Sequence, residues 1–451
     1  MCDRNRRYGL DGGKHDSDSK ARCPTWRCRG FLSPEFCPAC GVVGMSEKAR
    51  NQLREIAVFA GTAFRCSAFM TLNRCIRKTA MEEKKIEMPT TTNRNTLPDG
   101  TKPETLRTPA TVGVRKLWRV LWIGLMALGV SLLSGISMTI GWRPVVGPRA
   151  RTLTTREFER TPQRLERGRY IFMGLSGCVH CHSPFDMSRR GLPPVAGMTG
   201  AGQVLIDEAS RGRIVAPNLT PDVETGSGSW TDDQIARAIR EGIGHDGRTL
   251  FPMMPYKNFH SMSDEDLGSV VVFLRSLPPI RHELPKTKIP FPAKYLINRL
   301  PQPISSPVSA PDPGDRIQWG KYLVRLANCA DCHTARAAGG TPIAGMDFAG
   351  GSPIKFGTEA SASTNLTPDA SGIPYYDEAL FISTLRTGAV GARQLSSLMP
   401  FVIYRNLSDD DLKAMFAYLC TLNPVQHRVD NSLPPTYCRH CKHKHGAGDQ
   451  N

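Results

Sequence analysis

Two pentapeptides of one design constrain this chain of 451 residues more than any other feature. They are Cys178-Val179-His180-Cys181-His182 and Cys329-Ala330-Asp331-Cys332-His333. Cys-x-x-Cys-His is the attachment signature of covalently bound haem. Two thiols at this spacing can add to the two vinyl groups of one porphyrin, and the histidine then lies under the ring as a ligand of the iron.

The two motifs therefore predict two covalently bound haem c groups. Cys178 and Cys181 would hold the first, and Cys329 and Cys332 the second. The proximal iron ligands would be His182 and His333. Two zinc or disulfide loops in a protein without haem are the alternative.

The motifs belong to a long internal repeat. Five segments of residues 168–267 recur in the same order in residues 320–412, which indicates the duplication of one unit. The matched pairs are 168–170 with 320–322, 218–222 with 365–369, 240–242 with 386–388, 254–256 with 399–401, and 263–267 with 408–412.

A methionine in each unit is the candidate for the sixth iron ligand. Met254 and Met399 occupy equivalent positions, and each precedes a proline, which restrains the backbone of a ligand loop. Thioether sulfur is a common axial ligand in electron-carrying cytochromes, because it stabilises ferrous iron. A methionine in a loop can also merely fill a gap in the core, and Met253 is the neighbouring alternative to Met254.

Each unit is predicted to be mostly helical. Ser263 and Ser408 have the character of N-caps, since acidic residues and then leucines at helical spacing follow them. A middle helix is expected over residues 231–241 and again over residues 377–386. The segments between each haem motif and its middle helix are expected to be Gly- and Pro-rich loops.

The start of the chain resists interpretation. Residues 1–115 are predicted to be a disordered, basic extension, or to follow from a start assigned too early, with Met88 as an alternative start. Residues 1–116 hold 22 of the 58 Lys and Arg but 12 of the 41 Asp and Glu, so much of the net charge of +17 lies here. Cys23 and Cys28 with Cys37 and Cys40 could form a zinc ribbon. No basic segment studded with aromatic residues accompanies this charge, which argues against nucleic acid as a partner.

A membrane anchor is expected at residues 116–142. The chain has no charged residue from Val120 to Gly141, which is long enough for a helix across a bilayer. Trp118, Trp122 and Trp142 lie near its ends, where aromatic residues favour the interface. A cleaved signal peptide is the competing interpretation. Because haem c is attached outside the cytoplasm, we expect a single-pass protein of the cytoplasmic membrane with its haem domains on the periplasmic side.

Three further segments complete the predicted organisation. Residues 143–159 are expected to be a polar tether, residues 283–314 a Pro-rich linker, and residues 426–451 a tail that contains Cys and His. In the tail, Cys438 and Cys441 have three open interpretations: a disulfide or no role, a metal site with His440, His443 or His445, and a third haem ligated by lysine.

The remaining histidines are given surface roles. His180 is expected to be exposed between its two cysteines. His245, His260 and His282 are taken to have no counterparts in the second unit.

The motifs together resemble a known family. Residues 160–425 look like tandem class I cytochrome c domains, at residues 160–282 and 315–425. They are similar to the cytochrome c subunits of membrane-bound alcohol and gluconate dehydrogenases. The likeness rests on the haem motifs, the segment from Asn218 to Gly226, Trp230-Thr231-Asp232, and the run from Gly247 to Tyr256 with its Met-Pro pair. Those subunits usually carry three haem motifs, whereas this chain has two.

The resemblance implies an electron carrier rather than an enzyme. The chain would pass electrons from a dehydrogenase or a quinol-oxidising complex to a terminal oxidase or a soluble cytochrome, either alone or as a subunit of a dehydrogenase complex. The alternative is a di-haem peroxidase of the periplasm, which needs one iron open to peroxide. Two equivalent Met-Pro segments argue against an open iron.

Overall fold

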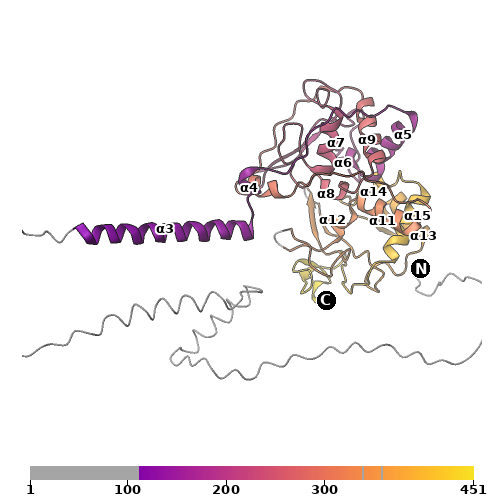
Figure 1. Cartoon of the computed structure of the whole chain (residues 1–451). Helices are drawn as coiled ribbons and strands as arrows, with labels where there is room; N and C mark the ends of the chain where they lie inside the picture. Colours follow the sequence, from indigo (N-terminus) through magenta and orange to yellow (C-terminus); the bar gives the residue numbers. More distant parts are fainter. Residues whose placement is uncertain (1–110, 338–339, 357–358) are drawn as a thin grey trace, which may run out of the picture. The chain divides into compact units, whose positions relative to one another are not determined.

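The computed structural model describes residues 111–337, 340–356 and 359–451. Within these ranges the chain is mostly helical, and its folded part begins after one long helix (Figure 1). The predictions of a zinc ribbon at Cys23–Cys40 and of a start at Met88 concern residues outside these ranges, as does the predicted disordered extension up to residue 110. Residues 111–115, predicted to belong to that extension, are instead helical, because they continue the long helix toward its N-terminus.

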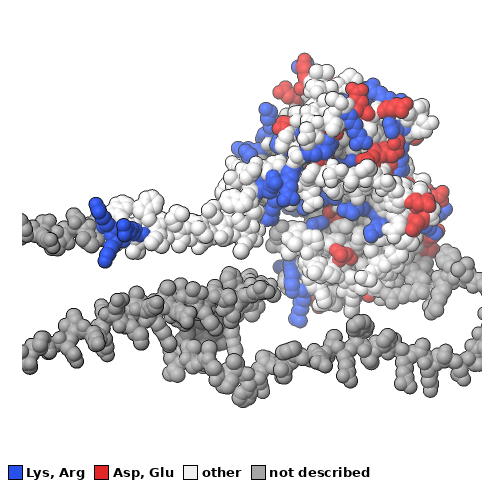
Figure 2. All heavy atoms as spheres, viewed as in Figure 1, with Lys and Arg blue, Asp and Glu red and all other residues white. Residues whose placement is uncertain are grey.

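The long helix, α3, runs from Thr111 to Thr139. Its stretch Arg115–Thr139 is apolar and long enough to cross a membrane, and none of its most apolar window is buried by the rest of the chain. Arg115, Lys116 and Arg119 gather at one end, and the rest of the helix carries no charged side chain (Figure 2). The helix therefore begins a few residues before the predicted start and ends at Thr139 rather than Trp142.

Two sets of helices follow in the same order. We call residues 160–282 the first half and residues 315–425 the second half. The first half holds α5 (Pro162–Tyr170), the π-helix η1 (Ile171–Leu175), α6 (Cys178–Cys181), α7 (Asp232–Glu241), α8 (Tyr256–Phe259) and α9 (Asp264–Ser276). The second holds α11 (Arg316–Leu326), α12 (Cys329–His333), α13 (Glu378–Thr387), α14 (Phe401–Tyr404) and α15 (Asp409–Cys420).

The predicted N-caps are confirmed. The Ser263 hydroxyl accepts from the Asp266 backbone N–H at 3.0 Å, and the Ser408 hydroxyl accepts from the Asp411 N–H at 3.2 Å. The middle helices begin one residue after the predicted bounds because their first residues, Thr231 and Asp377, are themselves caps.

A glycine lets the first and last helices of each half cross closely. A Cβ on Gly168 of α5 would lie 1.9 Å from the Ser269 carbonyl oxygen of α9. A Cβ on Gly320 of α11 would lie 1.9 Å from the Ala414 carbonyl oxygen of α15. These positions therefore tolerate no side chain.

Short antiparallel hairpins replace some of the predicted loops. β1 (Gln203–Glu208) pairs with β2 (Gly212–Ala216) in the first half, and β3 (Pro353–Phe356) with β4 (Glu359–Ala362) in the second. The prediction of irregular loop was wrong there. In the first half, the glycines and prolines flank two short apolar runs that pair. Two smaller hairpins are β5 (Ala389–Val390) with β6 (Arg393–Gln394) and β7 (Pro435–Tyr437) with β8 (Lys444–Gly446).

The two halves share one hydrophobic core and exchange equivalent hydrogen bonds. Tyr322 on α11 donates to Asp266 on α9 at 2.7 Å, and its oxygen accepts from the Ser263 N–H at 3.0 Å. Reciprocally, Tyr170 on α5 donates to Asp411 on α15 at 2.5 Å. Each half thus supplies a phenol to the capped helix end of the other.

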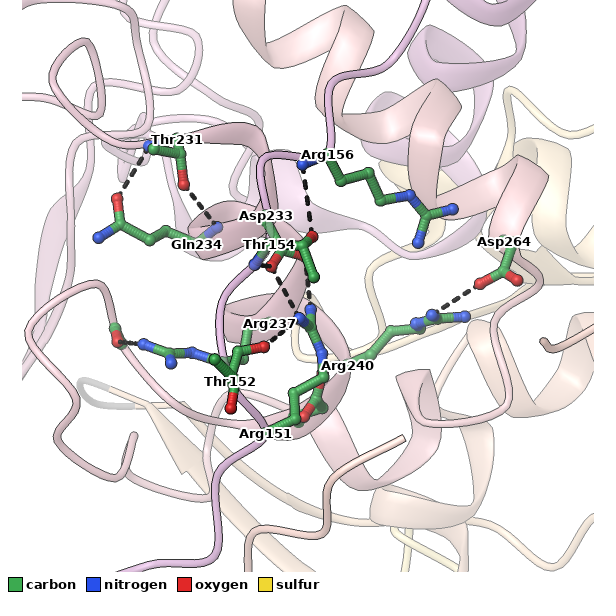
Figure 3. Close-up of polar contacts among 12 residues, drawn as sticks. Arg151, Thr152, Thr154, Arg156, Thr231, Asp233, Gln234, Arg237, Arg240 and Asp264 are labelled. Carbon is green, nitrogen blue, oxygen red and sulfur yellow. Dashed lines mark hydrogen bonds and ion pairs between the residues drawn. The ribbon is translucent and has the colours of Figure 1, made fainter. Parts of the chain in front are cut away.

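The predicted tether is docked on the first half (Figure 3). The guanidinium of Arg151 lies 2.6 Å from the Asp233 carboxylate and 2.7 Å from that of Glu241, both on α7. Burial alone would raise the pKa of Asp233, but Arg151 and the Thr154 N–H hold that pKa below its ordinary value. Residues 151–158 are therefore held to α7, while α4 (Arg143–Val146) lies earlier in the segment.

The predicted linker and tail also have defined structure. Lys288 exchanges backbone hydrogen bonds with Arg213 of β2, and the linker contains α10 (Ala293–Leu296) and η2 (Ile297–Arg299). The tail contains the β7–β8 hairpin and ends in η3 (Gly448–Gln450).

Candidate haem-binding site

The first Cys-x-x-Cys-His motif forms one turn of helix. Gly177 precedes it with φ of +58°, a left-handed conformation that glycine adopts without strain, and α6 then carries Cys178 and Cys181. Residues three apart face the same side of a helix, so both thiols can approach one ligand. His182 follows, is buried, and its Nδ1 lies 2.9 Å from the Pro217 carbonyl oxygen.

The second motif repeats this arrangement. Asn328 takes the left-handed conformation in place of glycine, with φ of +57°, and α12 carries Cys329, Cys332 and His333. The His333 ring is buried, and its Nδ1 lies 2.7 Å from the Thr364 carbonyl oxygen. Since a carbonyl oxygen only accepts, the Nδ1 of each motif histidine carries the proton and Nε2 is free to bind a metal.

The electrostatics suit neutral ligands in an apolar site. Burial, aided by its partner cysteine, raises the pKa of Cys178 to about 12 and that of Cys329 to about 12. Burial also lowers the pKa of His182 and of His333, against the opposing effect of their backbone hydrogen bonds. Both imidazoles are therefore neutral and present a lone pair.

One cavity of about 1660 Å³ runs along both motifs. Pockets for a single small ligand commonly measure about 300–1,000 Å³, so this volume suits two large groups. The cavity is lined by all eight residues predicted to hold the haems: Cys178, Cys181, His182, Met254, Cys329, Cys332, His333 and Met399. The rest of the lining is mainly apolar.

The two methionines enter the cavity wall from equivalent turns. The Met254 carbonyl accepts from the Tyr256 N–H at 2.8 Å just before α8, and the Met399 carbonyl accepts from the Phe401 N–H at 2.7 Å just before α14. Met254 packs against the core, whereas the neighbouring Met253 is 40% exposed. The thiols, the free imidazole nitrogens and the thioethers thus match the donor set that two haems c require.

Side chains from both halves lie beside the second motif. Asn258 of the first half donates to Asn328 and to Asp331 of the second, each at 2.9 Å. The hydroxyl of Tyr404 donates to the Ala327 carbonyl oxygen at 2.6 Å. Burial and then the neighbouring thiols of Cys329, Cys332 and Cys181 raise the pKa of Tyr404 well above its usual range.

Two predictions about the other histidines were wrong. His180 is half-buried rather than exposed, with its ring 4.6 Å from that of Phe185. His282 does have a counterpart, which is His427. The backbone N–H of His282 donates to the Thr225 hydroxyl, and its Nδ1 lies 2.8 Å from the Ala201 carbonyl oxygen. The backbone N–H of His427 likewise donates to the Ser371 hydroxyl, and its Nδ1 lies 2.7 Å from the Ala349 carbonyl oxygen.

The tail cysteines lie apart from this site. Cys438 and Cys441 are fully buried thiols and do not line the cavity. Of the three histidines considered as their partners, His440 is exposed and His443 contacts the Arg336 carbonyl oxygen at 2.5 Å, so neither faces the thiols. His445 is buried beside them.

Comparison with known proteins confirms the resemblance seen in the motifs. Residues 165–278 match the Cytochrome c family. The cytochrome c subunit of the quinone alcohol dehydrogenase of Gluconobacter oxydans is 27% identical over 282 residues, which is 58% of this chain and 55% of that protein. The gluconate 2-dehydrogenase cytochrome c subunit of Pantoea cypripedii is 30% identical over 278 residues, or 57% and 59%.

A third relative is nearer in length. The "diheme cytochrome c-type" of Cereibacter sphaeroides is 28% identical over 268 residues, which is 56% of this chain and 84% of that protein. The chain spans little more than half the length of the two dehydrogenase subunits. All three relatives are named as cytochromes or cytochrome subunits, not as catalytic subunits.

Proposed function

Because residues 165–278 form a domain of the cytochrome c family, we propose that this chain is a membrane-anchored di-haem c-type cytochrome that transfers electrons. Its two cytochrome c-type domains would be residues 160–282 and 315–425. The observation that carries the proposal is the single cavity that both Cys-x-x-Cys-His motifs line. When bound there, each haem would supply a one-electron carrier that cycles between ferric and ferrous iron.

The chain's own residues would bind each haem and leave its iron no open position for an external ligand. Cys178, Cys181, His182 and Met254 would hold the first haem. Cys329, Cys332, His333 and Met399 would do so for the second. The Pro217 and Thr364 carbonyls orient the two imidazoles, and the apolar lining excludes water, which together favour a fixed geometry in both oxidation states.

The arrangement also supports electron exchange between the two haems. Both motifs face one space, and Tyr404 lines it near the thiols of both motifs. An electron that enters one half would reach the other without leaving the molecule.

The partners follow from the relatives and from α3. The names of two relatives support a dehydrogenase as the electron donor, with a quinol-oxidising complex as the alternative donor. A terminal oxidase or a soluble cytochrome would be the acceptor. α3 would anchor the chain in the cytoplasmic membrane, with the haem domains on the periplasmic side, where haem c is attached.

Haem counting tests this proposal. The full chain should carry two haems, and Cys178→Ala with Cys181→Ala should leave one, as should Cys329→Ala with Cys332→Ala. Pyridine haemochrome spectra and intact mass measure the count. A chain with no covalent haem after expression with a haem-attachment system would overturn the proposal.

The di-haem peroxidase remains the competing activity. It would require hydrogen peroxide turnover and one iron that binds exogenous ligands. Each half contributes one methionine, Met254 or Met399, to the cavity lining at an equivalent position. A methionine available to each iron favours the electron carrier, because it leaves neither iron open to peroxide. Peroxide-dependent oxidation of a reduced cytochrome donor by the two-haem protein would reverse this preference.

A further inference from the structure

The tail gathers two cysteines and two histidines into one buried cluster. His427, Cys438 and Cys441 are fully buried, and His445 is 2% exposed. Their ligand atoms all lie within 4.8 Å of one another. We propose that His427, Cys438, Cys441 and His445 bind a structural zinc ion. This inference does not depend on the electron-transfer proposal.

The histidine rings are oriented for a metal. The Nδ1 of His427 lies 2.7 Å from the Ala349 carbonyl oxygen, and that of His445 lies 2.9 Å from the Gly446 carbonyl oxygen. Because these oxygens only accept, each Nδ1 carries the proton and each Nε2 presents a lone pair. Histidines that bind metals usually donate their second nitrogen in this way.

The two lone pairs point at each other. The Nε2 atoms of His427 and His445 are 3.2 Å apart, and neither carries a proton that could make this contact a hydrogen bond. Two facing lone pairs repel unless a cation lies between them. The His427 Nε2 is also 3.3 Å from the Cys438 sulfur.

The distances match a tetrahedral zinc site. With Zn–N bonds of about 2.0 Å and Zn–S bonds of about 2.3 Å, neighbouring ligand atoms around a tetrahedral ion lie about 3.3–3.8 Å apart. The two separations of 3.2 and 3.3 Å are close to this range. Two thiolates and two neutral imidazoles also balance the charge of Zn²⁺, so the buried site would be neutral. Four protein ligands leave no open position, which is typical of structural zinc rather than catalytic zinc.

The local backbone builds the cluster from two segments, the β7–β8 hairpin and the segment of His427, and packs it against a third. Cys438 and Cys441 lie in the turn of the β7–β8 hairpin, where the Cys438 N–H donates to the His443 carbonyl at 2.8 Å. His427 comes from the segment after α15. Gly351, with φ of +84°, brings the second half close: a Cβ there would lie 2.5 Å from the His427 ring and 3.2 Å from the Cys441 sulfur.

The first half contains a natural control. His282 makes the same backbone contacts as His427 but is only half-buried. Among the described residues, the one group of His, Cys, Asp or Glu close enough to hold an ion is the cluster in the tail. His282 and His427 therefore have the same role in the backbone fold of their segments. Only His427 is joined by three further ligands, which the β7–β8 hairpin supplies.

The zinc site would stabilise a segment of the tail that forms part of the haem cavity wall. The residues that follow His427, from Arg428 to Ser432, line the cavity, as do Gln450 and Asn451 at the end of the tail. The zinc ion would thus fix the tail against the second half, next to the second haem motif.

Zinc analysis of the whole, haem-loaded protein tests the inference. We expect about one zinc atom per chain by elemental analysis after dialysis. At the zinc X-ray absorption edge, which haem iron does not obscure, we expect two sulfur ligands at about 2.3 Å and two nitrogen ligands at about 2.0 Å. This measurement needs no variant. Less than about a tenth of a zinc atom per chain, or a shell of oxygen and nitrogen alone, would overturn the site.

Variants then identify the ligands. Cys441→Ser and His427→Ala should each lower the zinc content at least fivefold. His282→Ala, the matched change in the first half, and His440→Ala, an exposed neighbour in the tail, should leave it unchanged. A peptide that contains Cys438 and Cys441 and is 2 Da lighter than its dithiol form, recovered from zinc-free protein digested without reductant, would show a disulfide between them and would contradict the proposal.

Discussion

The strongest test of how the two halves hold each other is Tyr322→Phe. Tyr322 is 6% exposed, and its hydroxyl donates to the Asp266 carboxylate at 2.7 Å across the junction. Asp266 keeps Arg167 as a partner at 2.8 Å, so the substitution leaves no unpaired charge. It removes one hydrogen bond to a charged group, worth about 1.5–3 kcal/mol, and leaves the buried Ser263 N–H without its acceptor, which costs about 1 kcal/mol more.

We therefore expect Tyr322→Phe to lower the free energy of unfolding by about 2.5–4 kcal/mol. The reciprocal Tyr170→Phe should cost less, about 1–2 kcal/mol, because Tyr170 is only half-buried. Urea unfolding of the haem-loaded protein in detergent, followed by far-UV circular dichroism and by the Soret band, measures both. Tyr437→Phe, at a side chain that is 53% exposed, is the control. A Tyr322→Phe loss below about 0.5 kcal/mol, equal to that of the control, would refute the reasoning.

Three further predictions concern separate parts of the molecule. Gly168→Ala should destabilise the first half by about 3 kcal/mol, because its Cβ would meet the Ser269 carbonyl at 1.9 Å; urea midpoints measure this, and a neutral result would contradict the helix crossing. Arg151→Gln should cost about 2–3 kcal/mol and speed proteolysis of residues 151–158, since it leaves two carboxylates of α7 unpaired. Because the folded-state pKa of Asp233 is depressed, its ion pair with Arg151 stabilises the fold above about pH 4, and this stabilisation is lost as the pH falls below that value. Proteolysis of the wild type should therefore accelerate below about pH 4, whereas proteolysis of Arg151→Gln should not. Met399→Ala should open one iron, so that carbon monoxide changes the spectrum of one haem of two; an unchanged spectrum would refute its assignment as a ligand.

The local signals in the sequence predicted the local structure well. The caps at Ser263 and Ser408 and the turns of helix that carry the haem motifs depend on residues within one turn of each other, so a short pattern contains them. The hairpins were missed because their strands are short and flanked by glycine. Val204-Leu205-Ile206 and Ile214-Val215 are the apolar runs that could have revealed the first one.

The contacts between distant segments could not be predicted in this way. Tyr322 and Asp266 are 56 residues apart, and no periodicity links a phenol in one unit to a carboxylate in the other. His427 was missed for a related reason. The histidines near Cys438 and Cys441 in the sequence are His440, His443 and His445, whereas His427 lies 11 residues before Cys438. Its equivalence to His282 in the repeat was the available signal.

The most direct test of the account is the absorption spectrum of the reduced full-length protein before and after carbon monoxide is added. Two haems closed by His182 with Met254 and by His333 with Met399 predict a low-spin spectrum from two haems per chain that the gas does not change. A change at one haem would reveal an open iron. It would contradict the proposal of a pure electron carrier and would make the peroxidase the better interpretation.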